Sequence, residues 1–244
     1  MVSLAGVMAW PVTHSLSPHL HGYWLKRYGI NGTYLPLGVP PSHFKRALKN
    51  LPNTRFVGVN VTLPHKEEAL EMVDDADEMA RRIGAVNTVI VRADGSLLGT
   101  NTDGYGFLEN MRDFIPDWRA DKRPAVVLGA GGAARAVCVA LLEEGIGEVR
   151  LINRTRLRAV ALANELGRSV VVVPWLDRES TLEGAGLLVN ATSLGMNGKE
   201  ELDISLAKLP LSAVVYDIVY TPIETKLLFT ANCKLSFGSS CSII

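Results

Sequence analysis

Three short motifs in the first half of the chain place polar side chains where predicted strands end, the position at which open α/β sheets bind ligands. Together they supply hydroxyls, amides, one lysine and one carboxylate, with no hydrophobic binding stripe. Such a set suits a small polyhydroxylated acid. The motifs are His14-Ser15-Leu16-Ser17-Pro18, Asn60-Val61-Thr62-Leu63-Pro64-His65-Lys66, and Gly84-Ala85-Val86-Asn87-Thr88 with Asn101-Thr102-Asp103-Gly104.

Lys66 and Asp103 are the candidates for proton transfer, because a lysine beside a carboxylate can pass a proton to and from an alcohol while a nicotinamide takes the hydride. The alternation of a strand points Asn60 and Thr62 to the same side. Two simpler interpretations stay open: Ser17 acts only as a helix N-cap, and Lys66 is an ordinary surface lysine. The five histidines have no metal-binding spacing and no cysteine joins them, so we predict no metal.

A glycine-rich turn in the second half predicts a dinucleotide site. It runs Gly129-Ala130-Gly131-Gly132-Ala133-Ala134 between a predicted strand and a predicted helix. Gly129 permits the tight turn, Gly131 lets the backbone approach a pyrophosphate, and Ala134 lets the helix pack close to the sheet. The helix N-terminus then offers N–H groups and the positive end of its dipole to the phosphates.

The end of the next predicted strand indicates which dinucleotide binds. In an NAD site this position normally carries an acid that hydrogen-bonds the ribose 2′-hydroxyl, and such an acid would repel a 2′-phosphate. Here the chain has Asn153-Arg154-Thr155, with Arg158 one turn further on. Because arginine offers a planar fork of donors that fits phosphate, we predict NADP. The simpler alternative is a solvated Arg154 that begins a helix.

Short apolar runs alternate with helical patterns from end to end, which is typical of α/β architecture. We predict an N-terminal α/β substrate domain with a mixed sheet, followed by a Rossmann-like, doubly wound NADP-binding domain. The expected organisation is a substrate-binding and catalytic domain over residues 1–112, a linker over 113–124, the NADP-binding domain over 125–220 and a C-terminal segment over 221–244.

The elements that must position these motifs follow from the same alternation of patterns. Expected helices begin at Ser17, Ser42 and Pro64 in the first half and cover Ala133–Glu144 and Arg156–Gly167 in the second. The expected strands are Leu4–Ala9, Thr33–Gly38, Phe56–Val61, Thr88–Arg92, Leu97–Thr100, Ala125–Gly129, Glu148–Asn153, Val170–Val173, Gly186–Asn190 and Ala213–Asp217.

Composition argues against several classes of partner. Lys plus Arg and Asp plus Glu both number 25, so the formal net charge is zero, which argues against nucleic acid or an anionic membrane as the main partner. The apolar first ten residues carry no Lys or Arg, which makes a poor signal peptide. The most apolar stretch, Ala125–Leu142, is interrupted by glycines and by Arg135, which argues against a membrane span. We therefore predict a cytoplasmic protein.

Through many separated motifs, the chain from about Leu4 to Leu228 resembles the shikimate dehydrogenase family of aromatic amino-acid biosynthesis. The three polar motifs of the first half resemble the family's substrate and catalytic segments. Four segments of the second half resemble the family's NADP-domain signatures: Gly129–Ala133, Asn153-Arg154-Thr155, Asn190-Ala191-Thr192-Ser193-Leu194-Gly195-Met196 and Tyr216-Asp217-Ile218-Val219-Tyr220.

This resemblance implies a reaction, the reversible NADP-linked conversion of 3-dehydroshikimate to shikimate, with Lys66 as the acid/base working with Asp103. Whether the chain forms a homodimer stays an open question at this point. The implied substrate ligands are Ser15 and Ser17 for the carboxylate and Thr62, Asn87 and Asp103 for the hydroxyls, with Asn60 nearby and Tyr220 closing the pocket. The implied cofactor ligands are Gly129, Ala130, Gly131, Gly132, Ala133, Asn153, Arg154, Thr155, Arg158, Thr192, Ser193 and, at the nicotinamide, Ile218.

One part departs from the family's pattern. After Leu228 the family continues with a helix, a Gly-x-x-Met-Leu-x-x-Gln segment whose glutamine binds substrate, and a final helix that returns to the first domain. The stretch from Phe229 to Ile244 has no glutamine, and its serine-rich, capless end suits no helix. We expect this stretch to leave NADP binding intact, shikimate binding weak and turnover slow.

Two alternatives stay open for the chain as a whole. The first is a quinate/shikimate dehydrogenase paralogue that uses NAD, against which Arg154 argues. The second is a non-catalytic nucleotide-binding protein, disabled by the missing C-terminal element.

Overall fold

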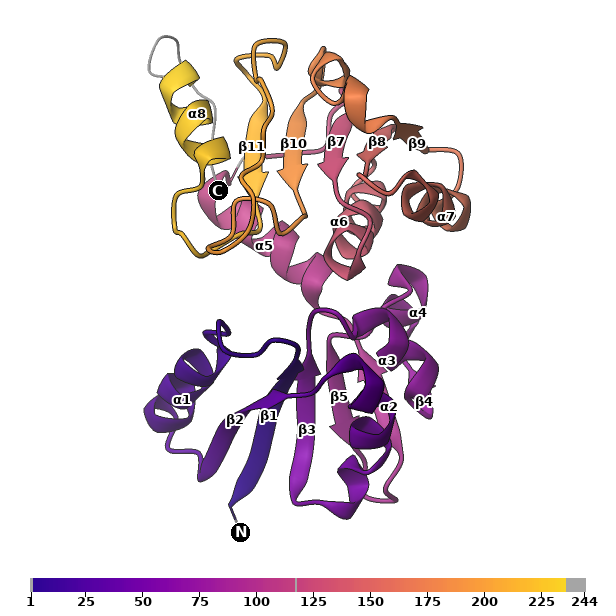
Figure 1. Ribbon diagram of the computed structural model, residues 1–244, viewed down its shortest axis with the longest axis vertical. Coiled ribbons are helices and arrows are strands. Elements are labelled where there is room, and N and C mark those ends of the chain that lie inside the picture. Colours follow the sequence, from indigo (N-terminus) through magenta and orange to yellow (C-terminus); the bar gives the residue numbers. More distant parts are fainter. Residues whose placement is uncertain (1, 117, 236–244) are drawn as a thin grey trace. The chain divides into compact units, whose positions relative to one another are not determined.

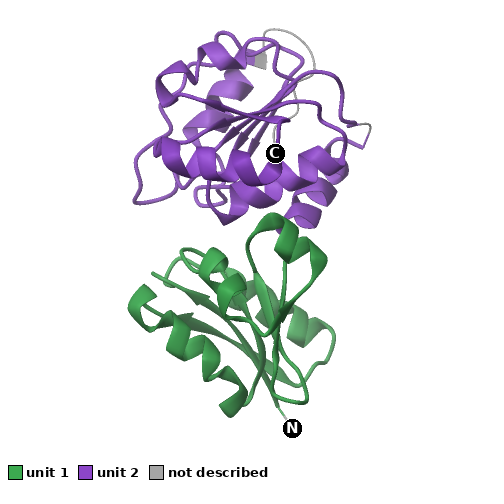
Figure 2. Cartoon of the chain, turned by 90° about the vertical axis from the view of Figure 1, so that its right-hand side faces the viewer, with its two compact units in different colours: residues 1–102 green, residues 103–244 purple. Residues whose placement is uncertain are grey.

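The computed structural model describes residues 2–116 and 118–235. The chain divides into two compact units, residues 1–102 and 103–244 (Figure 2). Helix α5 (Asp103–Phe114) belongs to the second unit because its Phe107 and Met111 pack into that unit's core. The division therefore falls after Thr102, rather than after residue 112 as expected. Asp117, in the expected linker over 113–124, lies outside the described residues.

The first unit is built on a six-stranded mixed sheet with the order β2-β1-β3-β5-β6-β4 (Figure 1). The strands β2, β1 and β3 run parallel, whereas β5 is antiparallel to both β3 and β6. The hairpin β5–β6 therefore makes the sheet mixed, as predicted. The bounds are β1 (Ser3–Ala9), β2 (Gly32–Gly38), β3 (Phe56–Val61), β4 (Asp75–Ala76), β5 (Thr88–Val91) and β6 (Leu97–Thr100).

The two faces of this sheet carry different side chains. One face packs Val59 and Val89 against Phe44 and Leu48 in a closed apolar core. Because side chains alternate along a strand, Asn60 and Thr88 lie on the opposite face, toward α1. The helices of this unit are α1 (Ser17–Arg27), α2 (Pro41–Lys49), α3 (Lys66–Met72) and α4 (Glu78–Ile83), with a 3₁₀ turn over Leu51–Asn53.

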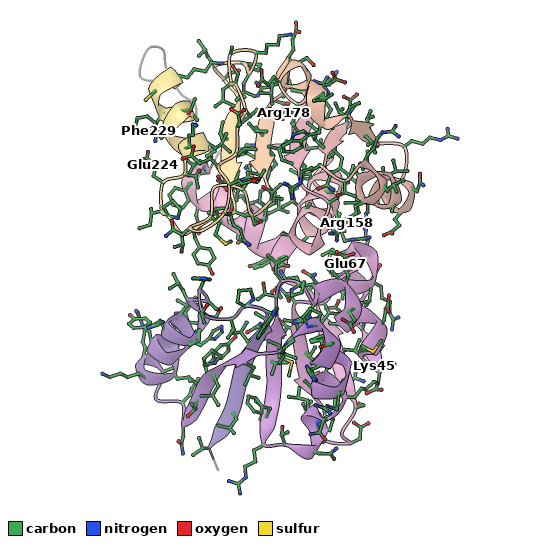
Figure 3. All side chains as sticks on the ribbon, in the orientation of Figure 1. Lys45, Glu67, Arg158, Arg178, Glu224 and Phe229 are labelled. Carbon is green, nitrogen blue, oxygen red and sulfur yellow. The ribbon has the colours of Figure 1, made fainter. Side chains whose placement is uncertain are left out.

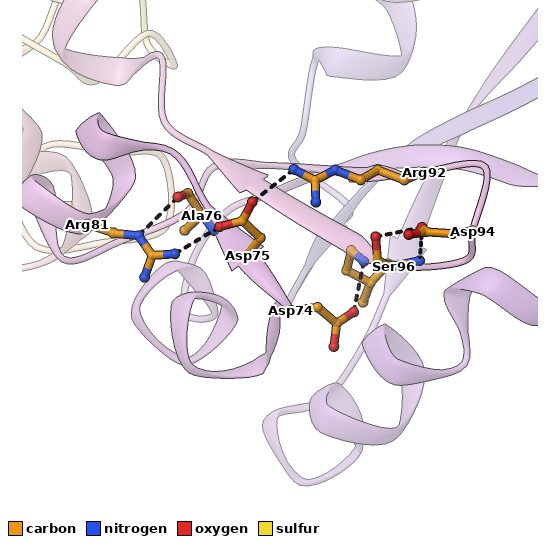
Figure 4. A network of polar contacts seen from close by, with 8 residues as sticks. Asp74, Asp75, Ala76, Arg81, Arg92, Asp94 and Ser96 are labelled. Atoms are coloured by element: carbon orange, nitrogen blue, oxygen red, sulfur yellow. Dashed lines mark hydrogen bonds and ion pairs between the residues drawn. The ribbon is translucent and has the colours of Figure 1, made fainter.

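Charged side chains hold the short edge strand β4 in place (Figure 4). Asp75 accepts from Arg81 and from Arg92, each at 2.9 Å, so one carboxylate joins α4, β4 and the end of β5. Asp74 accepts from the main-chain N–H of Leu97 at 2.8 Å. These ion pairs are half exposed, and charged side chains on an edge strand also discourage pairing with another chain.

The second unit contains a five-stranded, fully parallel sheet with the order β11-β10-β7-β8-β9. All four residues of β7, β10 and β11 are buried, as expected when both faces of a parallel sheet are covered. The strand order reverses between β7 and β10, which makes that point the topological switch of the sheet. The bounds are β7 (Ala125–Leu128), β8 (Val149–Ile152), β9 (Val170–Val173), β10 (Leu187–Asn190) and β11 (Val214–Asp217).

Helices cover the two faces of this second sheet separately, which is the predicted doubly wound arrangement. Cys138 and Leu162 belong to the cluster on one face, and Leu227 and Leu228 to the cluster on the other. The helices involved are α5, α6 (Gly132–Glu143) and α7 (Arg156–Leu166) on the first face and α8 (Lys226–Leu235) on the second, with 3₁₀ turns at Trp175–Asp177 and Ser180–Leu182. Within the described residues, no helix is long and apolar enough to cross a membrane.

The starts of α3 and α1 differ from those expected: α3 begins at Lys66 rather than at Pro64, and the N-cap of α1 is not the expected residue. Leu16, and not Ser17, is the N-cap of α1, and no side chain caps that helix. Helix α8 continues past Phe229 as far as Leu235 (Figure 3), so the expectation that the serine-rich end suits no helix falls on the residues after it. This helix does have a capping contact, because the Thr225 hydroxyl accepts from the N–H of Leu228 at 3.3 Å. Residues 236–244 lie outside the described part of the chain.

His65 is buried in the first unit and serves the fold. Its ring stacks on Phe44 with centroids 4.2 Å apart, and its Nε2 lies 2.8 Å from the carbonyl oxygen of Val39, which can only accept. Burial lowers the pKa of this imidazole below its ordinary value of 6.5, opposed by the Val39 hydrogen bond and by Glu68. The folded chain therefore binds a proton at His65 less readily than the unfolded chain does.

We predict that the first unit loses stability as the pH falls below about 6.5, because the unfolded chain then gains a proton that buried His65 resists. The contribution of His65 to the slope is at most about 1.4 kcal/mol per pH unit. His65→Gln, which keeps a donor for Val39, should flatten the pH dependence of unfolding by urea between pH 7 and 5. His43→Gln, at an exposed site on α2, is the control. An unchanged slope in His65→Gln would contradict this account.

Candidate functional site

Asn60, near the end of β3, is held by three polar contacts in the first unit. The Tyr34 hydroxyl donates to its Oδ1 at 2.6 Å. Its Nδ2 donates to the Thr88 hydroxyl at 3.0 Å and lies 3.4 Å from the main-chain oxygen of Asn87. Because both ends of the amide have partners, the side chain is fixed across β2, β3 and β5.

Asn87 extends this set toward the end of β6. It is buried, and its Oδ1 accepts from the Thr88 hydroxyl at 2.9 Å and from the main-chain N–H of Thr102 at 3.2 Å. Its Nδ2 donates to the Thr102 hydroxyl at 3.0 Å. The sheet therefore brings Asn60 and Asn87 together, as their motifs predicted, and joins them through Thr88.

Ser15 and Ser17 approach the same set from the start of α1. The main-chain N–H of Ser17 donates to the Ser15 hydroxyl at 3.3 Å, so Ser15 also has a local structural contact. The Ser17 side chain is hydrogen-bonded to Tyr34, and burial raises the pKa of the Tyr34 phenol to about 12. At ordinary pH this phenol keeps its proton and acts as a donor to Asn60.

Thr62 and Lys66 flank the turn between β3 and α3. The N–H of Thr62 donates to Met8 O at 3.0 Å, and Lys66 is the first residue of α3. The carbonyl of Lys66 accepts from Val86 N at 2.8 Å, which fixes the helix start beside the Asn87 segment. Asp103, predicted to work with Lys66, begins α5 of the second unit and directly follows Thr102 in the chain.

The glycine-rich turn joins β7 to α6 in the second unit. Gly129 has a φ of +114°, and a Cβ there would lie 2.7 Å from the carbonyl oxygen of Ala191. Only glycine tolerates both conditions. By contrast, a Cβ on Gly131 would meet no heavy atom within 4 Å, so the space beside that residue is open. Ala134 is fully buried, which agrees with close packing of α6 on the sheet.

The N-terminus of α6 fits a pyrophosphate. Its N-cap is Gly131, and no side chain caps the helix, so the N–H groups of its first turn are not blocked by a capping side chain. Those groups and the helix dipole favour an anion in the open space beside Gly131. Gly132 and Ala133 are the first two residues of this turn, and Ala130 is buried beneath it.

The end of β8 is basic and exposed. Asn153 Nδ2 donates to Thr155 O at 2.8 Å, which shapes the turn into α7. Arg154 extends outward with 75% of its side chain exposed, and its guanidinium lies 3.6 Å from Glu200. Arg158 lies in the first turn of α7 and is also exposed (Figure 3). No acid occupies the strand end itself, which agrees with a site for a 2′-phosphate.

A buried amide and carboxylate organise the ends of β10 and β11. Asn190 Nδ2 donates to Asp217 Oδ1 at 2.9 Å, and Asn190 Oδ1 accepts from the Thr192 hydroxyl at 2.7 Å. Asp217 also accepts from Val219 N at 3.0 Å and from the Thr225 hydroxyl at 2.7 Å. Burial raises the pKa of the Asp217 carboxyl, and these three donors oppose that rise.

This pair of side chains fixes the loops that carry the other predicted cofactor and pocket residues. Ser193 and Ile218 are half-buried, and the N–H of Ile218 donates to Asn190 O at 3.1 Å. Tyr220 is 55% exposed on the loop before α8.

Sequence reasoning gave no role to several residues of these networks, among them Thr102, Asn190, Asp217 and Thr225. Tyr34 reads as an ordinary strand aromatic, Thr88 was quoted in a motif without a role, and Glu200 carries no motif. The signal for Thr88 was its place beside Asn87, at the start of a strand. In the described residues, no three side chains of His, Cys, Asp or Glu lie together as a metal site would require; the absence of a metal remains a prediction.

Comparison with known proteins agrees with this geometry. The family model of the shikimate dehydrogenase substrate binding domain matches residues 7–89, and that of shikimate / quinate 5-dehydrogenase matches residues 114–225. Together these matches span most of both units.

Individual relatives are similar over nearly the whole chain. The NADP(+) shikimate dehydrogenase of Paramagnetospirillum magneticum is 55% identical over 231 residues, which cover 95% of this chain and 84% of that protein. The one from Rhodospirillum rubrum is 56% identical over 233 residues, 94% of this chain and 82% of that protein. The crystal structure of shikimate 5-dehydrogenase from Thermus thermophilus, in complex with NADP(H) and shikimate, is 40% identical with a TM-score of 0.84, over 100% of this chain and 87% of that one. The chain therefore belongs to the shikimate dehydrogenase family.

Proposed function

We propose that this chain catalyses the reversible NADP-linked oxidation of shikimate to 3-dehydroshikimate, a reaction of chorismate and aromatic amino-acid biosynthesis. The proposal rests on two features of this one chain. The first is the hydrogen-bonded series Asn60, Thr88 and Asn87 in the first unit. The second is the glycine-rich turn of the second unit, together with the exposed Arg154 that follows β8. The relatives named for this reaction with NADP(+) support it. We place the activity in the cytoplasm, and a homodimer stays a prediction.

The substrate is assigned to the first unit and to the residue that follows it. Hydroxyls at Ser15 and Ser17 suit the substrate carboxylate, because a charged acceptor gives strong hydrogen bonds. For the Ser17 hydroxyl this means turning its single proton away from Tyr34. The ring hydroxyls are assigned to Thr62, Asn87 and Asp103, with Asn60 behind them and Tyr220 closing the pocket.

The cofactor is assigned to the carboxyl ends of β7, β8, β10 and β11. Residues Gly129–Ala133 hold the pyrophosphate at the start of α6, while Asn153, Arg154, Thr155 and Arg158 hold the adenosine end with its 2′-phosphate. Thr192, Ser193 and Ile218 line the nicotinamide end. When bound, NADP supplies the hydride acceptor for the reaction.

The proton step is assigned to Lys66. As the substrate alcohol is oxidised, Lys66 Nζ accepts the hydroxyl proton, and in reduction it returns that proton to the alkoxide oxygen. The Asp103 carboxylate is assigned to the same hydroxyl and works with Lys66 in this step.

A steady-state assay tests the proposal as a whole. The chain should reduce NADP with shikimate and do so far better than it reduces NAD with either shikimate or quinate. Preferential turnover with NAD and quinate would favour the NAD-using alternative. NADP binding with no turnover of shikimate at any concentration would favour a non-catalytic nucleotide-binding protein.

Arg154→Ala should weaken NADP binding by roughly ten- to a hundredfold, because a hydrogen bond to a charged group is lost at the 2′-phosphate. NAD binding should barely change, and Arg168→Ala, at an exposed site just after α7, is the matched control. Glu200→Gln should tighten NADP binding, since it removes a negative charge 3.6 Å from the same guanidinium. Calorimetric titration measures all three, and equal losses for NADP and NAD in Arg154→Ala would refute the assignment.

Lys66→Met should lower kcat by about 10²–10⁴-fold, the usual contribution of general acid–base catalysis. The dissociation constant for NADP should stay nearly constant, because the dinucleotide is assigned to the second unit. Lys45→Met, on the exposed face of α2 (Figure 3), is the matched control. Near-normal turnover by Lys66→Met would mean that Lys66 is an ordinary surface lysine.

A further inference from the structure

Thr88 lies between the two amides of the substrate site and contacts both. Its hydroxyl is 3.0 Å from Asn60 Nδ2 and 2.9 Å from Asn87 Oδ1. A hydroxyl has one proton to donate and two lone pairs that accept. The direction of each hydrogen bond therefore depends on which end of each amide faces Thr88.

Main-chain groups fix both amides. The N–H of Thr102 can only donate, and it lies 3.2 Å from one end of the Asn87 side chain, so that end is the oxygen. The main-chain oxygen of Asn87 can only accept, and it lies 3.4 Å from one end of the Asn60 side chain, so that end is the nitrogen. Between these ends, Thr88 has to accept from Asn60 and donate to Asn87.

The hydrogen bond between Tyr34 and Asn60 has the same direction. Tyr34 is buried and donates its single proton to Asn60 Oδ1 at 2.6 Å. The hydrogen bonds thus run in one direction, from Tyr34 to Asn60, to Thr88 and to Asn87. With Oδ1 of Asn87 supplied by Thr88 and by Thr102 N, the nitrogen end of Asn87 is turned away from Thr88. One of the two donors on this nitrogen faces the Thr102 hydroxyl at 3.0 Å.

From this geometry we propose that Thr88 is a positioning residue, whose hydroxyl holds Asn87 with its amide nitrogen directed as a donor to a substrate hydroxyl. The inference rests on the proposed function, because it needs Asn87 to bind shikimate. Thr88 itself touches no substrate. Asn60, with both ends committed to protein groups, serves the same purpose from behind Thr88.

Thr88→Val removes the hydroxyl while keeping the shape and the strand preference of the side chain. Because two hydrogen bonds are lost and the amides lose their common partner, we expect the KM for shikimate to rise by about tenfold, with a smaller change in kcat. The KM for NADP should not change. Thr88→Ser, which restores the hydroxyl, should return the KM for shikimate to within about twofold of the wild-type value. Thr33→Val, the same substitution at an exposed site on β2 of the same sheet, is the control and should leave both constants unchanged.

A double-mutant cycle separates positioning from general loss of structure. If Thr88 acts through Asn87, then Thr88→Val should have almost no further effect on the shikimate KM in an Asn87→Ala background. Full additivity of the two changes would overturn the proposal, as would a wild-type KM in Thr88→Val or no rescue by Thr88→Ser. If Thr88→Val unfolds, Thr88→Ala carries the same expectation without a methyl placed against the amides.

The two hypotheses fail differently. If the unaltered chain does not turn over shikimate with NADP, the proposed function fails. If the unaltered chain is active and Thr88→Val matches it, only the role of Thr88 fails.

Discussion

A buried amide at the end of a central strand has to satisfy an oxygen and a nitrogen at once, and this constraint shapes both units. In the first unit it falls on Asn87, which joins the start of β5 to the end of β6 through Thr88 and Thr102. In the second it falls on Asn190, which joins β10 to β11 through Asp217. Leaving either amide half-satisfied would cost a desolvation penalty of about 1–3 kcal/mol, so the loops beyond these strands are held to one geometry.

The two fixed edges suit different ligands. Hydroxyl and amide groups dominate the first, and directional donors and acceptors of this kind suit the hydroxyls of a small polar acid. The second offers an uncapped helix N-terminus beside Gly131 and a guanidinium at Arg154, both of which favour phosphate. This difference is why the specificity for cofactor and for substrate should respond to separate substitutions.

The sequence predicted the glycine-rich turn and each strand of the described residues except the short β4, because apolar runs and glycine at a tight turn are local signals. The position of Gly129 follows from its φ and from the close approach of Ala191. Other features depend on contacts between distant segments. Only packing, such as that of Phe107, assigns α5 to the second unit. Tyr34 reaches Asn60 across β1, which the strand order places between β2 and β3. The continuation of α8 past Phe229 depends on burial of Leu227 and Leu228 and on the Thr225 contact, which composition did not reveal.

A crystal structure of this chain with shikimate and NADP bound would test the central claim most directly. The account predicts a substrate carboxylate on the Ser15 and Ser17 hydroxyls, a ring hydroxyl on Asn87 Nδ2, and the 2′-phosphate on Arg154. Shikimate bound away from these groups, or a ring hydroxyl that donates to an Asn87 oxygen turned toward the ligand, would contradict it.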